Sequence, residues 1–333
     1  MTRALLVRAE TIKLARLLDI SDPARLDFLS GLSPEAIRAF RERATDLLFD
    51  RDARRMQGVA AAAELVPTAI SAKAAERAFG PVLCAAVAGS VKPAQAVAIA
   101  KALPAKFLAE TAVRLDPRRT AAVIAEVPPR LVAQVAKELF ARGDHVTMGR
   151  FVGVVPEPSM RAALPEASDA DLLRIGFLLE DKSRMDTLLG IVEDRIPGVI
   201  RAAYEQGLWA EAIDLLGTVN ATNRVKIADV AVGLGTEVLG ALLAAVRDLN
   251  AWATLIPIAQ AQDPAERVRV LEIVAGMADL DGFLAALTPQ TPSAVWQSLI
   301  EVRAQIPPAL AERLAARAEA CAHATVADDL RAA

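Results

Sequence analysis

The chain has 333 residues and a formal net charge of −3, with 54% hydrophobic but only 4% aromatic residues. A charge so close to zero gives no general attraction to nucleic acid or to an anionic membrane surface, so nucleic acid is not expected as a partner. An interior rich in Ala, Leu and Val favours closely packed short helices, because Ala loses no side-chain entropy in a helix.

Residues 1–58 are predicted to form an N-terminal helical cap. Asp22-Pro23 and Ser33-Pro34 each place a proline in the first turn of a helix, directly after a side chain that can cap the helix. Both pairs are therefore helix starts.

The N-terminal sequence and the cysteines indicate a cytoplasmic protein. Arg3, Arg8 and Glu10 interrupt the first ten residues, which excludes a signal peptide. No stretch reaches the roughly twenty mostly uncharged residues of a transmembrane helix, so none is expected. Cys84 and Cys321 are far apart in sequence and make no disulfide framework, which favours a reducing compartment.

Residues 59–195 carry a twelve-residue repeat, marked by prolines at nearly equal intervals: Pro81, Pro93, Pro104, Pro117, Pro129 and, after one longer unit, Pro156. Each unit has room for one short helix and a tight turn, and a helix should start within two residues of each proline. Helices of about nine to twelve residues are expected between residues 79 and 190. Such a unit cannot bury its own apolar face and must stack on its neighbours, which predicts an all-α fold of the α-solenoid type, a superhelix of short helical repeats.

Residues 196–333 follow a different repeat. Trp209, Trp252 and Trp296 are each followed four residues later by an isoleucine, a spacing that places both side chains on one helix face. The intervals between the tryptophans fall in the range of HEAT and armadillo repeats, which have two or three helices per unit. We expect all three indole rings to be mostly buried between repeats.

The phrases at residues 103–110, Leu-Pro-Ala-Lys-Phe-Leu-Ala-Glu, and 127–135, Val-Pro-Pro-Arg-Leu-Val-Ala-Gln-Val, resemble units of the MgtE intracellular N-terminal domain. The flagellar switch protein FliG has similar short-helix units. The resemblance covers about residues 79–190 and implies a superhelical fold with a regulatory or docking role. It does not imply transport, because the chain lacks the nucleotide-binding-like modules and the membrane domain of those transporters.

The sequence carries no pattern typical of an enzyme, so no catalytic residue, metal or cofactor is expected. His145, one of only two histidines, has poor metal ligands at helical spacing, and a structural or exposed role is the simpler interpretation. Gly233-Leu234-Gly235 lacks the third glycine of a phosphate-binding loop and more simply ends a helix.

Basic residues gather within residues 101–142, whereas acidic residues predominate within 166–195. The simplest interpretation is two solvated faces, but a basic surface beside an acidic one can also steer a partner. The candidate partner-binding residues are Arg114, Arg118, Arg119 and Arg130. Arg118 and Arg119 are expected to open a helix whose dipole disfavours cations, so an anionic group of a partner would be favoured there.

Three functions remain open from sequence. The first is a non-enzymatic scaffold or adaptor that docks another protein. The second is a carrier or sensor of an apolar small molecule or lipid, because a mean hydropathy of +0.32 is high for a thin solenoid unless some apolar surface lines a cavity. The third is an enzyme whose site the sequence does not reveal.

Overall fold

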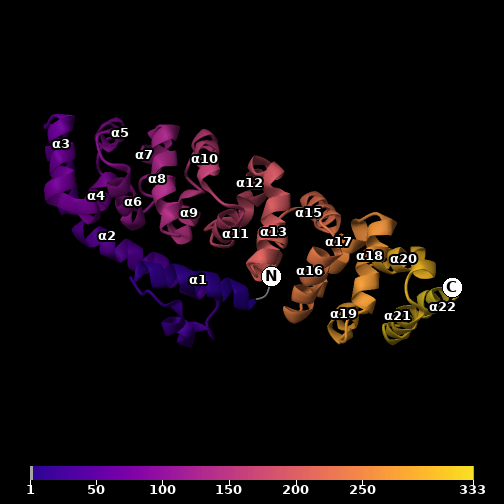
Figure 1. The fold of residues 1–333 in the computed structure, drawn as a ribbon. Helices are drawn as coiled ribbons and strands as arrows, with labels where there is room; N and C mark the ends of the chain where they lie inside the picture. Colours follow the sequence, from indigo (N-terminus) through magenta and orange to yellow (C-terminus); the bar gives the residue numbers. More distant parts are fainter. Residues whose placement is uncertain (1–2, 333) are drawn as a thin grey trace. The chain divides into compact units, whose positions relative to one another are not determined.

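The computed structural model describes residues 3–332, apart from the side chains of residues 48–55 and 64. Every regular element in this range is a helix and none is a strand, which confirms the all-α prediction for the described residues. The chain divides into two compact units, residues 3–184 and residues 185–332, which we describe separately (Figure 1). No helix among the described residues is long and apolar enough to cross a membrane.

The N-terminal unit combines two longer helices with a series of short ones. Its elements are α1 (Arg3–Leu17), η1 (Pro23–Leu29), α2 (Pro34–Glu64), α3 (Thr68–Ala74), η2 (Ala75–Phe79), α4 (Gly80–Ala88), α5 (Pro93–Lys101), α6 (Ala105–Arg114), α7 (Ala121–Glu126), α8 (Pro129–Ala141), α9 (His145–Phe151), α10 (Glu157–Ala163), η3 (Leu164–Glu166), α11 (Asp169–Phe177) and η4 (Lys182–Arg184). As expected, the side chains of Asp22 and Ser33 cap η1 and α2.

The short helices pack in two rows. In one row, α3 contacts α5 and α5 contacts α7. In the other row, α4 contacts α6, α6 contacts α8 and α8 contacts α10. α1 and α2 run along one side of the short helices, where α2 packs on α4 and α1 packs on α9 (Figure 1). Each short helix therefore buries its apolar side against the helix two positions away in sequence.

Proline marks the helix starts with one exception. Helices begin within two residues of Pro81, Pro93, Pro104, Pro129 and Pro156, as predicted. The prediction is wrong for Pro117, because α7 begins only at Ala121. There the side chain of Asp116 accepts the backbone N–H of Arg118 and its carbonyl accepts that of Arg119, so residues 117–120 form a turn instead.

The predicted helix length holds for only part of the series. α4, α5, α6 and α11 have nine or ten residues, but α7, α9, α10 and α12 (Met185–Ile191) have six or seven and α8 has 13. The twelve-residue interval thus sets where units begin, whereas local turns decide how much of each unit is helical.

The C-terminal unit is a succession of helices of more even length. After α12 its elements are η5 (Glu193–Arg195), α13 (Ile196–Glu205), α14 (Trp209–Leu216), α15 (Ala221–Gly233), α16 (Thr236–Asp248), α17 (Trp252–Ala261), α18 (Pro264–Ala275), α19 (Asp281–Ala286), α20 (Ser293–Glu301), η6 (Arg303–Gln305), α21 (Pro308–Ala320) and α22 (Ala324–Arg331).

One kind of tight turn joins helices in both units. In each case a backbone N–H bonds to the carbonyl five residues earlier, across a residue with positive φ. This is the hydrogen bond of the Schellman motif, which satisfies the last carbonyls of a helix. In these five turns the residue with positive φ is Asp19, Gly143, Gly207, Asn250 or Ala322.

The tryptophans do not share one repeat position. Trp209 and Trp252 are the first residues of α14 and α17, two residues after the positive-φ residue of the preceding turn, whereas Trp296 lies in the middle of α20. Trp252 and Trp296 are buried as predicted, but Trp209 is only half-buried. The 43- and 44-residue spacing therefore does not mark three equivalent residues.

Candidate functional site

The basic segment proposed as a partner site comprises Arg114, Arg118, Arg119 and Arg130, and two of these, Arg118 and Arg119, lie in a turn and not at a helix start. Arg118 donates from Nε and Nη2 to the two carboxylate oxygens of Asp116, at 3.2 and 3.0 Å. Asp116 itself is held in place by its bond to the Arg118 backbone N–H, and its carbonyl accepts the hydroxyl of Thr120. The expectation that Arg118 and Arg119 open a helix is therefore corrected: they precede the six-residue helix α7.

The two arginines face α2. Asp46 accepts a hydrogen bond from Arg119 at 3.0 Å, and its carboxylate lies 3.6 Å from Nη2 of Arg118. A third member, Arg114, lies 4.0 Å from the carboxylate of Asp19 in the turn after α1. Three of the four predicted residues thus lie beside the N-terminal helices. The tertiary fold brings them there, since Arg119 and Asp46 are 73 residues apart in sequence.

Arg130 lies at the second position of α8, on an exposed surface. The side chains of Arg114 and Arg118 remain about half exposed, at 48% and 54%. The basic segment is therefore partly neutralised by the chain's own carboxylates but still accessible.

A buried ion cluster lies where α1 and α2 meet the turn after α11. Glu10 and Lys13 are 2% and 3% exposed and pair at 2.9 Å, and Lys13 also donates to the carbonyl of Leu179. Arg41 donates to both carboxylate oxygens of Glu180 and reaches Glu10. Arg38 also donates to Glu10, so two carboxylates and three cations are placed together.

Electrostatics keep Glu10 ionised in this cluster. Burial opposes the charge most strongly, but the attraction of Lys13 and the hydrogen bond from Arg38 outweigh it, so the pKa of Glu10 is lowered. Burial lowers the pKa of Lys13 despite the carboxylates of Glu180 and Glu10. The sequence did not predict this cluster, because Glu10 and Glu180 are brought together only by the tertiary fold.

The side chains of His145, Cys84 and Cys321 are partly or fully buried among other residues of the fold. His145 Nε2 lies 2.6 Å from the carboxylate of Asp171, which also caps α11 by exchanging hydrogen bonds with Ser168. Burial raises the pKa of the Cys84 thiol, and Cys321 is buried. No cluster of three or more metal-binding side chains occurs in the part of the chain that the structure describes.

One carboxylate pair was not anticipated. Asp229 of α15 and Glu266 of α18 lie around the buried amide of Gln262, which donates to Asp229 at 3.1 Å and to Glu266 at 3.5 Å. Burial, followed by the hydrogen bond with Asp229, raises the pKa of Glu266. Gln262 therefore lies between the two carboxylates, and no nucleophile or histidine takes part in these contacts.

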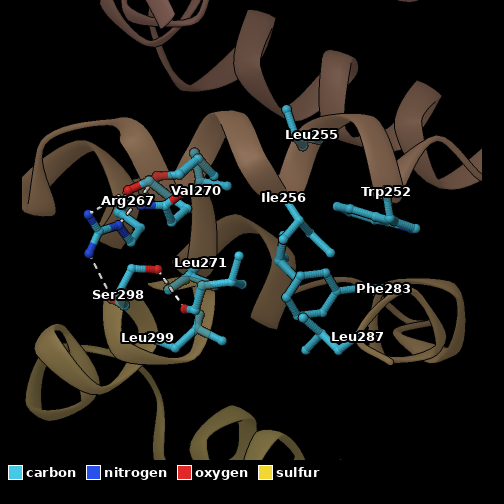
Figure 2. Close-up of a pocket in the computed structure, with 14 residues that line it drawn as sticks. Trp252, Leu255, Ile256, Arg267, Val270, Leu271, Phe283, Leu287, Ser298 and Leu299 are labelled. Carbon is cyan, nitrogen blue, oxygen red and sulfur yellow. Dashed lines mark hydrogen bonds between the residues drawn. The ribbon is translucent and has the colours of Figure 1, made fainter. Parts of the chain in front are cut away.

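A cavity of about 40 Å³ lies between α17, α18, α19 and α20 of the C-terminal unit (Figure 2). Trp252, Phe283 and Leu287 line one side of it, and Val270 and Leu299 line another. Ligand pockets for drug-sized molecules are typically about 300–1,000 Å³, so this cavity does not provide room for a lipid chain.

The buried guanidinium beside this cavity has a structural role. Arg267 is 5% exposed and donates to four backbone carbonyls, including those of Gln262 and Ser298, and to the carboxylate of Glu301. It therefore joins the end of α17 to α20 by satisfying carbonyls at helix ends.

The chain has no match among protein-family models, curated proteins or solved structures. The resemblance of residues 79–190 to the MgtE intracellular N-terminal domain therefore stays a prediction.

Proposed function

We propose that this protein is a non-enzymatic docking module that binds an acidic helical segment of another protein. The observation that carries the proposal is the contact of Arg118 and Arg119 with Asp46, because the basic segment already binds a carboxylate presented by a helix of its own chain. A partner helix with a similar carboxylate would meet the same two guanidinium groups.

The charges of this surface support an anionic occupant. Guanidinium groups form strong, directional bonds with carboxylates, and those of Arg114 and Arg118 are half exposed. Arg130 extends the exposed basic surface to α8. Complementary charge of this kind mainly increases the rate and specificity of association.

The proposed architecture is an α-solenoid, with short-helix repeats in the N-terminal unit and HEAT- or armadillo-like repeats in the C-terminal unit. Its support is the contact of helices two positions apart within the rows α3–α5–α7 and α4–α6–α8–α10, a pattern that nearest-neighbour stacking of repeats produces. Solenoids offer extended surfaces, which suits the docking of a helical segment.

The test is site-resolved photo-crosslinking of the full chain in its native host. A photo-reactive amino acid replaces Arg114 in one variant and Arg130 in another, and a matched control carries it at the exposed Arg313 of α21. We expect the same protein to crosslink at positions 114 and 130 but not at 313. The crosslinks should be lost in the Arg118→Ala/Arg119→Ala background and should weaken as salt is raised.

Two outcomes would overturn the proposal: no crosslinked protein at positions 114 and 130, or crosslinks that persist when both arginines are removed. Because Arg119 is partly buried against Asp46, its loss also affects stability. The single Arg118→Ala variant, which removes a side chain that is 54% exposed and leaves the Arg119–Asp46 contact in place, therefore repeats the test with less effect on folding.

A further inference from the structure

Large apolar side chains are exposed only near the N-terminal end of the described chain. All ten of them lie between Leu18 and Val82. Five gather around the rod formed by α3 and η2 and the start of α4: Leu65, Val66, Ile70, Phe79 and Val82. Leu65 is 88% exposed, Val82 65%, Ile70 57% and Phe79 46%.

This rod is the end of the two rows of short helices. α3 packs on α5 and α4 packs on α6, whereas α5 and α6 each have a neighbour of their own row on both sides. In Figure 1 no helix of the N-terminal unit lies on the outer side of α3. The exposed apolar residues thus lie where a preceding pair of helices would stack.

The helices α21 and α22 of the C-terminal unit provide a comparison. α21 and α22 bury Leu310, Leu314 and Leu330 and carry ion pairs of Arg331 with Glu312 and Glu319 on their surface. No large apolar side chain is exposed in the described part of the C-terminal unit. Repeat proteins need such polar ends for solubility, and the α3 end lacks one.

We infer that the α3 end is an interface between two copies of this chain, related by a two-fold axis. The central part of the rod carries exposed charges of both signs, Lys73, Glu76 and Arg77. With the two rods antiparallel, Lys73 of one copy faces Glu76 of the other. The apolar residues at the start of one rod then meet those at the end of the other.

This geometry makes the surface self-complementary, as a two-fold contact requires. A partner of one charge sign would meet a like charge at either Lys73 or Glu76, whereas a second copy offers Glu76 to Lys73 and Lys73 to Glu76. The contact also covers an apolar surface that would otherwise remain in water.

Sedimentation velocity of the purified full chain tests the inference. Between about 1 and 100 µM we expect a species of twice the 35.3 kDa of one chain to accumulate. Leu65→Lys and Val82→Glu, at opposite ends of the rod, should each weaken this association at least about tenfold. Both side chains are mostly exposed, so neither change should impair folding.

Mixing the two variant chains tests the antiparallel arrangement. In a mixed dimer the lysine introduced at position 65 of one chain faces the glutamate introduced at position 82 of the other. The second contact is unchanged, so association should recover. Phe28→Glu, which alters a 77% exposed side chain of η1, is the matched control and should associate like the parent chain.

A monomer at about 100 µM would overturn the inference, as would a dimer that both end variants leave intact. Failure of the mixture to associate would exclude the antiparallel arrangement. These results do not depend on Arg114, Arg118, Arg119 or Arg130, so the two proposals can fail separately.

Discussion

Arg41 of α2 binds both carboxylate oxygens of Glu180, at 2.9 and 2.8 Å, although 139 residues separate the two in sequence. The same guanidinium reaches Glu10 of α1 at 3.3 Å. This bidentate pair holds the N-terminal helices to the turn after α11. Ion pairs therefore connect α1 and α2 to the end of the short-helix series.

Replacing Arg41 by Ala should lower the free energy of unfolding by about 2–4 kcal/mol. The change removes both short hydrogen bonds to Glu180 and one to the buried Glu10, and leaves Glu180 only the longer 3.7 Å contact with Lys13. Urea denaturation followed by circular dichroism measures the loss. Arg43→Ala, which removes an exposed arginine of the same helix, should cost no more than about 0.5 kcal/mol. Equal stability of the two variants would show that the cluster does not hold the helices.

The ion cluster should make stability depend on pH through Glu10. Its pKa in the folded state lies below the ordinary value of 4.5, so its contribution is complete above that value and is lost as pH falls through the lowered pKa. Glu10→Gln should destabilise the protein at neutral pH and reduce the decline below about pH 5. The same change at the exposed Glu35 controls for the loss of a charge. Parallel pH profiles for Glu10→Gln and the parent would contradict the assignment.

Trp252→Ala should lower the free energy of unfolding of the C-terminal unit by about 3–5 kcal/mol. The indole is 1% exposed and packs edge-on against Phe283, with 5.2 Å between ring centroids. Thermal melts measure the effect, and Trp209→Ala should cost less because that ring is only half-buried. A Trp252→Ala variant that melts with the parent would remove this ring from the core.

Gly149 allows α9 to approach the end of α11 closely. A Cβ at this position would lie 2.8 Å from the backbone oxygen of Leu178, so Gly149→Ala must push the two segments apart. We expect a loss of about 1–3 kcal/mol in urea denaturation. Gly153→Ala, where a Cβ would meet no atom within 4 Å, is the control. Similar melting of both variants would argue against the close approach.

Ala322 is an alanine in a conformation that favours glycine. Its φ is +65°, in the turn between α21 and α22. Ala322→Gly should therefore raise the free energy of unfolding by about 0.5–1 kcal/mol, because it removes the clash of Cβ with the backbone. Ala316→Gly, at an exposed position in the middle of α21, should instead lower the free energy of unfolding by a similar amount, about 0.5–1 kcal/mol. Opposite signs in thermal melts would confirm the turn.

Local sequence determined the helices and most of their starts. Pro81, Pro93 and Pro129 mark helix starts because their fixed φ and missing N–H suit the first turn whatever the surroundings. Pro117 shows the limit, since the side chain of Asp116 offers the same backbone groups a turn instead. The short-helix repeat could likewise be predicted from the sequence, because a unit of twelve residues has room for only one short helix and a turn.

Which charges meet was decided by packing. Nothing in the order of residues indicated that Glu10 would pair with Arg41, or that Arg119 would face Asp46 of α2. Such pairs depend on which helices lie side by side, and the strength of a charge contact depends on burial that is created only when they pack. The order of residues therefore specifies an aliphatic chain of short helices, and the packing of those helices places its basic segment against its own N-terminal helices.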